Sequence, residues 1–204
     1  VQGGEKWGRY SIIGLPARTV LKVYGHRVVV ERDGSIVEEA EAADPLAWIE
    51  QFQARYSAAE HPDMPRFAGG LVGYFGYDTV RYIEPKLAHC PSPDQMGTPD
   101  ILLMLSEEVV VFDNLRGRIY IIVHLDPAAG DSPATGQARI DELVAKMRRG
   151  APRNPEAGGR SIAETDFVSG FSEAGFEAAV KRIKDYILAG DCMQVVLSQR
   201  LSIP

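Results

Sequence analysis

Short stretches near the start of the chain alternate hydrophobic and polar residues, which is typical of β-strands. Residues 17–40, ARTVLKVYGHRVVVERDGSIVEEA, contain three such stretches, separated at Gly25-His26 and at Asp33-Gly34. Glycine in a two-residue turn supplies the positive φ angle that a tight hairpin needs. The pattern therefore predicts an antiparallel meander of three strands.

Other stretches repeat their hydrophobic residues every three or four positions, which predicts amphipathic helices. We expect helices over residues 45–56, 134–149 and 173–189. Asp44 precedes the first of these helices and Ser172 precedes the third, and both residue types commonly cap a helix N-terminus.

Two further segments are interpreted as strands. Residues 101–126 predict two long strands around a turn at 114–117, because apolar β-branched runs flank a polar break that contains glycine. In residues 69–78, GGLVGYFGYD, large apolar residues interleave with the glycines. No Lys-Ser/Thr pair follows these glycines, so we expect a closely packed strand and not a phosphate-binding loop.

The pattern at the C-terminal end, residues 192–203, also predicts a strand. One face would carry Gln194, Ser198 and Arg200, and the other face would be apolar. A strand of this kind normally needs pairing partners on both edges, which a helix alone does not supply. We therefore expect this segment to open a second domain of an interrupted polypeptide.

The whole pattern predicts an α+β fold, with antiparallel β-sheets packed together and helices on the outside. Hairpins dominate the pattern, and no alternation of strand, helix and strand appears. Residues 151–170 are rich in Gly, Pro and charge without periodicity, so we expect a linker or mobile loop there. This linker would separate a region over 1–150 from a second unit over 171–204.

Composition narrows the possible partners and the compartment. The chain has 204 residues, of which 45% are hydrophobic, and a net charge of −6. An acidic chain offers no basic surface to nucleic acid or to an anionic membrane, so we expect neither as a partner. No apolar run is long enough for a membrane span, which favours a cytoplasmic protein. No metal-binding spacing relates the scattered cysteines and histidines, which are Cys90, Cys192, His26, His61, His89 and His124.

Four phrases of the sequence resemble a known family. They are GRYSIIG at 8–14, GGLVGYFGYDTVRY at 69–82, FDNLRGRIYII at 112–122, and FEAAVKRIKDYILAGDCMQVVLSQR at 176–200. Together they resemble the large component of anthranilate synthase, within the chorismate-binding enzyme superfamily. The resemblance runs through all 204 residues and covers less than the first half of such a component.

The resemblance implies a lyase of tryptophan biosynthesis. Such an enzyme binds chorismate and Mg²⁺, takes ammonia from a partner glutaminase subunit, and releases anthranilate and pyruvate. It also implies that residues 1–150 form a regulatory region for tryptophan as feedback inhibitor, and that 171–204 begin the chorismate-binding catalytic domain. The family's metal-binding glutamates and catalytic histidine lie downstream of Pro204. We therefore expect the fold to be truncated before this domain is complete, assign no metal ligand, and expect the chain alone to be inactive.

Gln194 is the residue that the resemblance assigns to catalysis. Relatives that add water to chorismate have a lysine at this position as general base, whereas ammonia brings its own lone pair. A neutral amide that orients the nucleophile can then suffice. Spacing alone favours an ordinary polar residue on a solvated strand face, and only the resemblance favours the catalytic role.

Arg9, Tyr10 and Ser11 match the region where the family places a basic residue in the effector site. The serine and glutamate that bind the amino group of tryptophan in the family would precede Val1, so we expect tryptophan binding to be impaired. The alternative is a first strand whose arginine extends along apolar surface to reach water.

Two other functions stay open. One is the related aminodeoxychorismate synthase of folate biosynthesis, which also uses ammonia and shares the GGLVGY phrase. The other is a non-catalytic regulatory module that binds an amino acid or a partner subunit.

Overall fold

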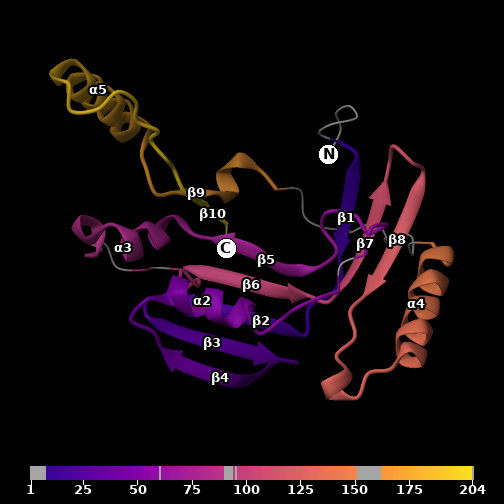
Figure 1. The fold of residues 1–204 in the computed structure, drawn as a ribbon. Helices are drawn as coiled ribbons and strands as arrows, with labels where there is room; N and C mark the ends of the chain where they lie inside the picture. Colours follow the sequence, from indigo (N-terminus) through magenta and orange to yellow (C-terminus); the bar gives the residue numbers. More distant parts are fainter. Residues whose placement is uncertain (1–7, 60, 90–93, 95, 151–161, 204) are drawn as a thin grey trace. The chain divides into compact units, whose positions relative to one another are not determined.

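The fold was analysed on a computed structural model that describes residues 8–59, 61–89, 94, 96–150 and 162–203. The chain forms two compact units, Val1–Ala151 and Pro152–Pro204, and most contacts of each unit lie within it (Figure 1). Whether the two units have regulatory and catalytic roles stays a prediction.

The first unit is built on a five-stranded antiparallel sheet with the strand order β4-β3-β2-β6-β5. Its strands are β2 (Thr19–Tyr24), β3 (Arg27–Arg32), β4 (Ser35–Glu41), β5 (Gly70–Phe75) and β6 (Ile101–Ser106). The predicted meander is confirmed, because β2 pairs with β3 and β3 pairs with β4. At the second turn, Asp33 and Gly34 have φ angles of 51° and 79°, the left-handed pair that a tight hairpin turn needs.

Helix α2 (Pro45–Gln53) covers one face of this sheet (Figure 1). Asp44 caps the helix as predicted, since its Oδ1 accepts hydrogen bonds from the Leu46 and Ala47 amides at 3.0 and 3.1 Å. The apolar side of the helix then meets the apolar side of the sheet. Together they form the main core, with buried residues Leu21, Val23, Val28, Val30, Ala42, Ile49, Phe52, Ile101 and Leu103.

The prediction of two long strands over 101–126 is wrong in one respect, because the first of them is two strands. The run breaks at Glu107 into β6, which belongs to the large sheet, and β7 (Glu108–Asp113), which pairs with β8 (Arg118–Val123). Strands β1 (Tyr10–Gly14), β7 and β8 form a second, three-stranded antiparallel sheet. Both parts of the run are apolar because both are largely buried, so the hydrophobic pattern does not reveal the change of sheet.

Helix α4 (Pro133–Arg148) contacts β8, as the orange segment beside that strand shows in Figure 1. Ser132 caps it, with the Ser132 Oγ accepting from the Thr135 amide at 3.2 Å. Leu143 is buried, in agreement with the predicted apolar stripe. Short helical turns complete this unit: η1 (Tyr77–Thr79), α3 (Val80–Ile83), η2 (Pro85–Leu87) and η3 (Pro127–Ala129).

The glycine-rich segment forms the predicted strand, β5, at one edge of the large sheet. A Cβ atom on Gly73 would overlap the carbonyl oxygen of Leu102 on the neighbouring strand β6. The missing side chain therefore permits a close approach of two backbones. This is the packing role expected for these glycines.

The second unit contains η4 (Glu164–Asp166), β9 (Val168–Ser169), helix α5 (Glu173–Ala189) and β10 (Leu201–Ser202). Ser172 caps α5, and Gly190 ends it in the left-handed conformation, as expected. Part of the predicted linker, 151–161, lies outside the described residues. The rest of that linker contains η4 and β9.

The predicted strand over 192–203 is largely wrong. Only Leu201 and Ser202 form a strand, paired with β9. Residues 192–199 have no regular structure, and the predicted core side of the segment stays exposed, with 96% of Met193 and 57% of Leu201 accessible. A strand is stabilised by its pairing partners, and among the described residues β9 supplies a ladder of only two residues.

The fold class is confirmed as α+β with antiparallel sheets and outer helices. Within the described ranges, no helix combines the length and the apolar character that crossing a membrane requires.

Candidate functional site

The predicted effector residues Arg9, Tyr10 and Ser11 lie at the start of β1, beside the turn that joins β7 to β8. Antiparallel pairing places Tyr10 opposite Asp113 and Ser11 opposite Phe112. The start of β1 therefore meets the end of β7. We call Arg9, Tyr10, Ser11, Asp113 and Asn114 the β1–β7 corner.

Arg9 makes a two-bond ion pair with Asp113. Arg9 Nε lies 3.0 Å from Asp113 Oδ1, and Nη2 lies 2.7 Å from Oδ2. The Asp113 side chain is 1% exposed, and its Oδ1 also accepts from the Arg116 amide at 3.1 Å. The hydrogen bonds from Arg9 lower the pKa of Asp113 to about 2, so this carboxylate is ionised at neutral pH.

Tyr10 contacts the Arg9 guanidinium, and Asn114 links the β7–β8 turn to β1. The Arg9 guanidinium carbon lies 4.7 Å from the centre of the Tyr10 ring, which is within range of a cation–π interaction. Tyr10 packs in turn on the small core of Val109, Val111 and Ile122. Asn114 Nδ2 donates to Ser11 Oγ at 3.2 Å, which ties the turn to β1.

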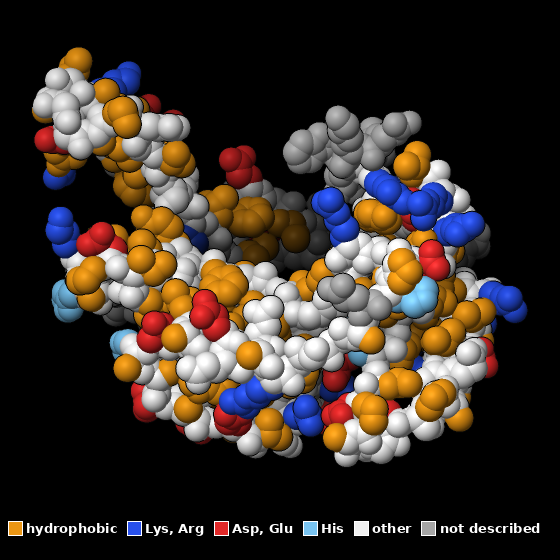
Figure 2. All heavy atoms as spheres, viewed as in Figure 1, with side chains coloured by type: hydrophobic (Ala, Val, Ile, Leu, Met, Phe, Trp, Pro, Cys, Tyr) orange, Lys and Arg blue, Asp and Glu red, His pale blue; other side chains and the backbone are white. Residues whose placement is uncertain are grey.

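The turn beside the corner adds positive charge. Arg116 and Arg118 are exposed at the β7–β8 turn, where Figure 2 shows a group of blue Lys and Arg side chains. Arg9 uses Nε and Nη2 for Asp113, so its Nη1 edge has no part in that ion pair. A guanidinium fixed in this way can donate to a carboxylate.

Sequence reasoning proposed Arg9, Tyr10 and Ser11, and it did not name Asp113 and Asn114, which the structure places beside them. Asp113 and Asn114 stand within FDNLRG, a phrase that contributes to the family resemblance and contains the predicted turn, but that predicts no site residue. Their polarity beside a buried strand is a weak signal, because Asp and Asn are also ordinary turn residues. Only the pairing of β1 with β7 brings them to Arg9. The effector role of the corner stays a prediction.

Gln194 is exposed in the segment without regular structure that follows α5. It lies in the second unit, whereas the β1–β7 corner lies in the first. Ser198 and Arg200 do not share a strand face with it, since the strand that would align them is absent. Its catalytic role stays a prediction.

The part of the chain that the structure describes contains no group of three or more His, Cys, Asp or Glu side chains that could hold a metal ion. No described residue is therefore assigned as a ligand of the Mg²⁺ implied by the resemblance.

Comparison with known proteins assigns a family. The family of chorismate binding enzymes matches residues 6–204. The chain is 57% identical over 210 residues to anthranilate synthase component 1 of Pseudomonas aeruginosa, and 47% identical over 206 residues to that of Neisseria meningitidis. Each match covers 100% of this chain, but only 42% and 41% of those relatives.

A solved structure agrees with the sequence matches. The crystal structure of anthranilate synthase component I from Streptococcus pneumoniae matches with a TM-score of 0.72 and 26% identity. This match covers 100% of the chain and 43% of the crystallised protein. The chain thus spans about two-fifths of the length of the relatives it matches, and the family resemblance is confirmed.

Proposed function

Because the chain belongs to the chorismate binding enzyme family, we propose that it is part of an anthranilate synthase component I. Such an enzyme is a lyase that adds ammonia to chorismate and eliminates pyruvate to leave anthranilate, the first step of tryptophan biosynthesis. The observation that carries the proposal is the 57% identity to a protein named anthranilate synthase component 1, extending over the full chain. A cytoplasmic location and a glutaminase partner that supplies ammonia belong to the same proposal.

In this proposal Gln194 orients the nucleophile. A neutral amide can accept a hydrogen bond from ammonia through its oxygen and leave the nitrogen lone pair directed at the ring. Ammonia needs no general base to become nucleophilic, whereas water does. No described residue is assigned to Mg²⁺, and the role of Gln194 does not depend on the metal.

The β1–β7 corner is the proposed contact for tryptophan as feedback inhibitor. Its fixed Arg9 guanidinium, with the Nη1 edge outside the Asp113 pair, has the charge and planar geometry that a carboxylate requires.

The aminodeoxychorismate synthase alternative is not favoured, because the named relatives with these identities are anthranilate synthases. A non-catalytic regulatory role stays an alternative function for the 204 residues on their own.

The proposal is tested with a chimera. The matching part of the Pseudomonas aeruginosa enzyme is replaced by these 204 residues, and anthranilate fluorescence is followed with chorismate, ammonium and Mg²⁺. We expect the chimera to form anthranilate and the 204 residues alone to form none. The intact Pseudomonas enzyme serves as positive control. A folded chimera without activity, beside an active parent enzyme, would contradict the proposal.

A further inference from the structure

The turn between β3 and β4 holds a residue pair that is prone to a covalent rearrangement. Asp33-Gly34 is the only Asp-Gly pair in the sequence. The side chain of an aspartate can react with the backbone nitrogen of the next residue, and glycine hinders this approach least because it has no Cβ atom. The sequence therefore favours such a reaction most at this turn.

The structure leaves both reacting groups accessible. Asp33 has a φ angle of 51°, and it is the one non-glycine residue with a positive φ angle among the described residues. The Gly34 amide donates no backbone hydrogen bond within the described part of the chain. The Asp33 side chain is 54% exposed. Water therefore reaches the carboxyl group, and the Gly34 nitrogen is not held by another acceptor.

The reaction needs water and no other reagent. The Gly34 nitrogen forms a bond to the side-chain carboxyl carbon of Asp33. The protonated carboxyl group loses its OH, which leaves as water with the proton of the nitrogen, and a succinimide ring closes. Water then adds to one of the two ring carbonyl carbons and opens the ring. Opening at the main-chain carbonyl leaves the chain connected through the side chain of residue 33, as isoaspartate, with the mass unchanged.

Arg18 holds the carboxyl group that this reaction needs. Arg18 Nε lies 3.0 Å from Asp33 Oδ1, and Nη2 lies 2.7 Å from Oδ2. The Asp33 amide also donates to the Arg18 carbonyl oxygen at 2.8 Å. The side-chain hydrogen bonds lower the pKa of Asp33. An ionised carboxylate has no OH to lose, so the ring closes only after this pair opens.

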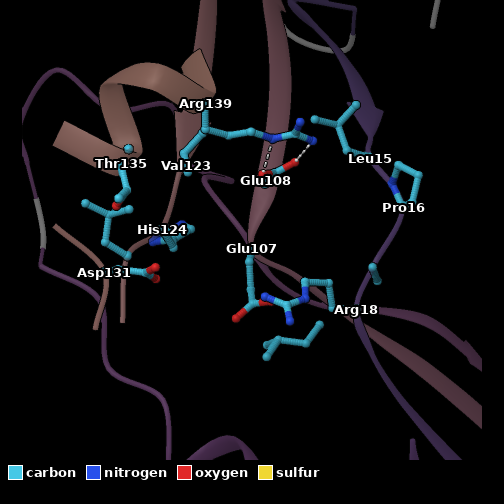
Figure 3. Close-up of a pocket in the computed structure, with 14 residues that line it drawn as sticks. Leu15, Pro16, Arg18, Glu107, Glu108, Val123, His124, Asp131, Thr135 and Arg139 are labelled. Carbon is cyan, nitrogen blue, oxygen red and sulfur yellow. Dashed lines mark hydrogen bonds and ion pairs between the residues drawn. The ribbon is translucent and has the colours of Figure 1, made fainter. Parts of the chain in front are cut away.

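Two further carboxylates attract the same arginine. Arg18 stands at the border of a cavity of about 330 Å³, where Figure 3 shows its side chain beside Glu107. The hydrogen bonds to Asp33 raise the pKa of Arg18, and the charges of Glu107 and Asp131 add to this rise. Arg18 is therefore charged and stays close to the turn.

We propose that Asp33 is a site of spontaneous isoaspartate formation, and that Arg18 slows this reaction in the folded protein. Isoaspartate adds one methylene group to the main chain, whereas the register of a hairpin is fixed by the length of its turn. The modification would therefore loosen the pairing of β4, an edge strand of the large sheet, with β3. This inference holds or fails independently of the proposed enzyme activity.

The test follows the reaction in the 204-residue chain at neutral pH over several weeks. Digestion after glutamate releases residues 32–38, RDGSIVE, as one peptide. Its aspartyl and isoaspartyl forms have the same mass and are separated by chromatography. We expect isoaspartate to form at Asp33 in the chain unfolded by urea, and to form at least about tenfold more slowly in the folded chain.

Variants separate the effect of Arg18 from a general effect of lost charge. Arg18→Gln should speed up the reaction in the folded chain about twofold to fivefold, which is the range for an exposed ion pair. Arg18→Lys keeps the charge without the two-bond geometry and should give an intermediate rate. Arg27→Gln is the matched control on the same hairpin, because it removes the ion pair with Glu39 and leaves that of Asp33 intact.

Three results would overturn the proposal. The first is an unfolded chain that forms no isoaspartate at Asp33. The second is a folded chain that reacts as fast as the unfolded one. The third is an equal rate for Arg18→Gln and Arg27→Gln in the folded state.

Discussion

Arg9 and Asp113 are separated by 104 positions in the sequence, yet they form a two-bond ion pair at the junction of β1 and β7. The aspartate is almost fully enclosed, at 1% exposure, whereas the arginine is 28% exposed. The pair therefore fixes a half-exposed guanidinium against a buried carboxylate. It links β1 to β7 within the three-stranded sheet.

Removal of the Asp113 charge should destabilise the fold. In Asp113→Asn, the side-chain amide keeps one acceptor oxygen but places an NH₂ group against the guanidinium, so one ion-pair bond becomes a donor–donor contact. We expect the melting temperature to fall by several degrees. Asp63→Asn removes the same charge at a position that is 89% exposed, and it should change the melting temperature little. Equal effects of the two substitutions would contradict a structural role of the pair.

The same pair predicts how stability depends on pH. The pKa of Asp113 is lowered to about 2 by the Arg9 hydrogen bonds, from about 3.9 in an unfolded chain. When folding lowers the pKa of a carboxylate, the charged group stabilises the folded state. This stabilisation is fully present above the pKa of the unfolded chain, and it is lost as the pH falls through the pKa of the folded state. The difference in free energy of unfolding between wild type and Asp113→Asn should be constant above about pH 5 and should shrink towards pH 2. If this difference in free energy of unfolding stays constant down to pH 2, the ionised Asp113 carboxylate is not its source.

The sequence predicted local features of the structure correctly, and it did not predict features that depend on distant strands. The turns at Gly25 and Asp33 and the caps Asp44 and Ser172 were predicted correctly, because turn and cap chemistry is contained within a few residues. The break at Glu107 was missed, because it depends on which distant strands pair with each half of the run. The candidate site follows the same rule.

For the candidate site, the sequence suggested residues at the start of β1, but it did not indicate which residues at the end of β7 contact them. No spacing rule connects Arg9 with a residue 104 positions away. The strand expected around Gln194 failed for a related reason. Its alternation of polar and apolar residues is clear, but pairing is needed to hold a strand, and β9 provides two paired positions among the described residues.

Gly73 gives a test of close packing between β5 and β6. Gly73→Ala would place a methyl group onto the Leu102 carbonyl oxygen, so the two strands would have to separate. We expect the free energy of unfolding to fall by roughly 2–4 kcal/mol in urea denaturation. Gly14→Ala is the matched control in β1, since a Cβ atom there meets nothing within 4 Å. It should change the free energy of unfolding by less than roughly 0.5 kcal/mol. A tolerated alanine at position 73 would show that the sheet can relax around it.

The role proposed for Gln194 can be tested in the active chimera. Gln194→Ala removes the amide that would orient ammonia, and a misplaced nucleophile costs on the order of 10²-fold in rate. We expect kcat/KM for ammonia to fall by about that factor, with folding unchanged because the side chain is exposed. Gln51→Ala makes the same substitution at an exposed position on α2 and should leave the rate unchanged.

Gln194→Lys sharpens this test, because lysine is the residue of the relatives that add water to chorismate. A lysine amine can act as a general base for water, but it offers ammonia no oriented acceptor. The variant should therefore lose anthranilate formation and gain a hydroxylated product, detected by chromatography of the chorismate reaction. If Gln194→Ala and Gln194→Lys both retain full ammonia-dependent activity, the side chain does not orient the nucleophile, and its polarity reflects only exposure to water.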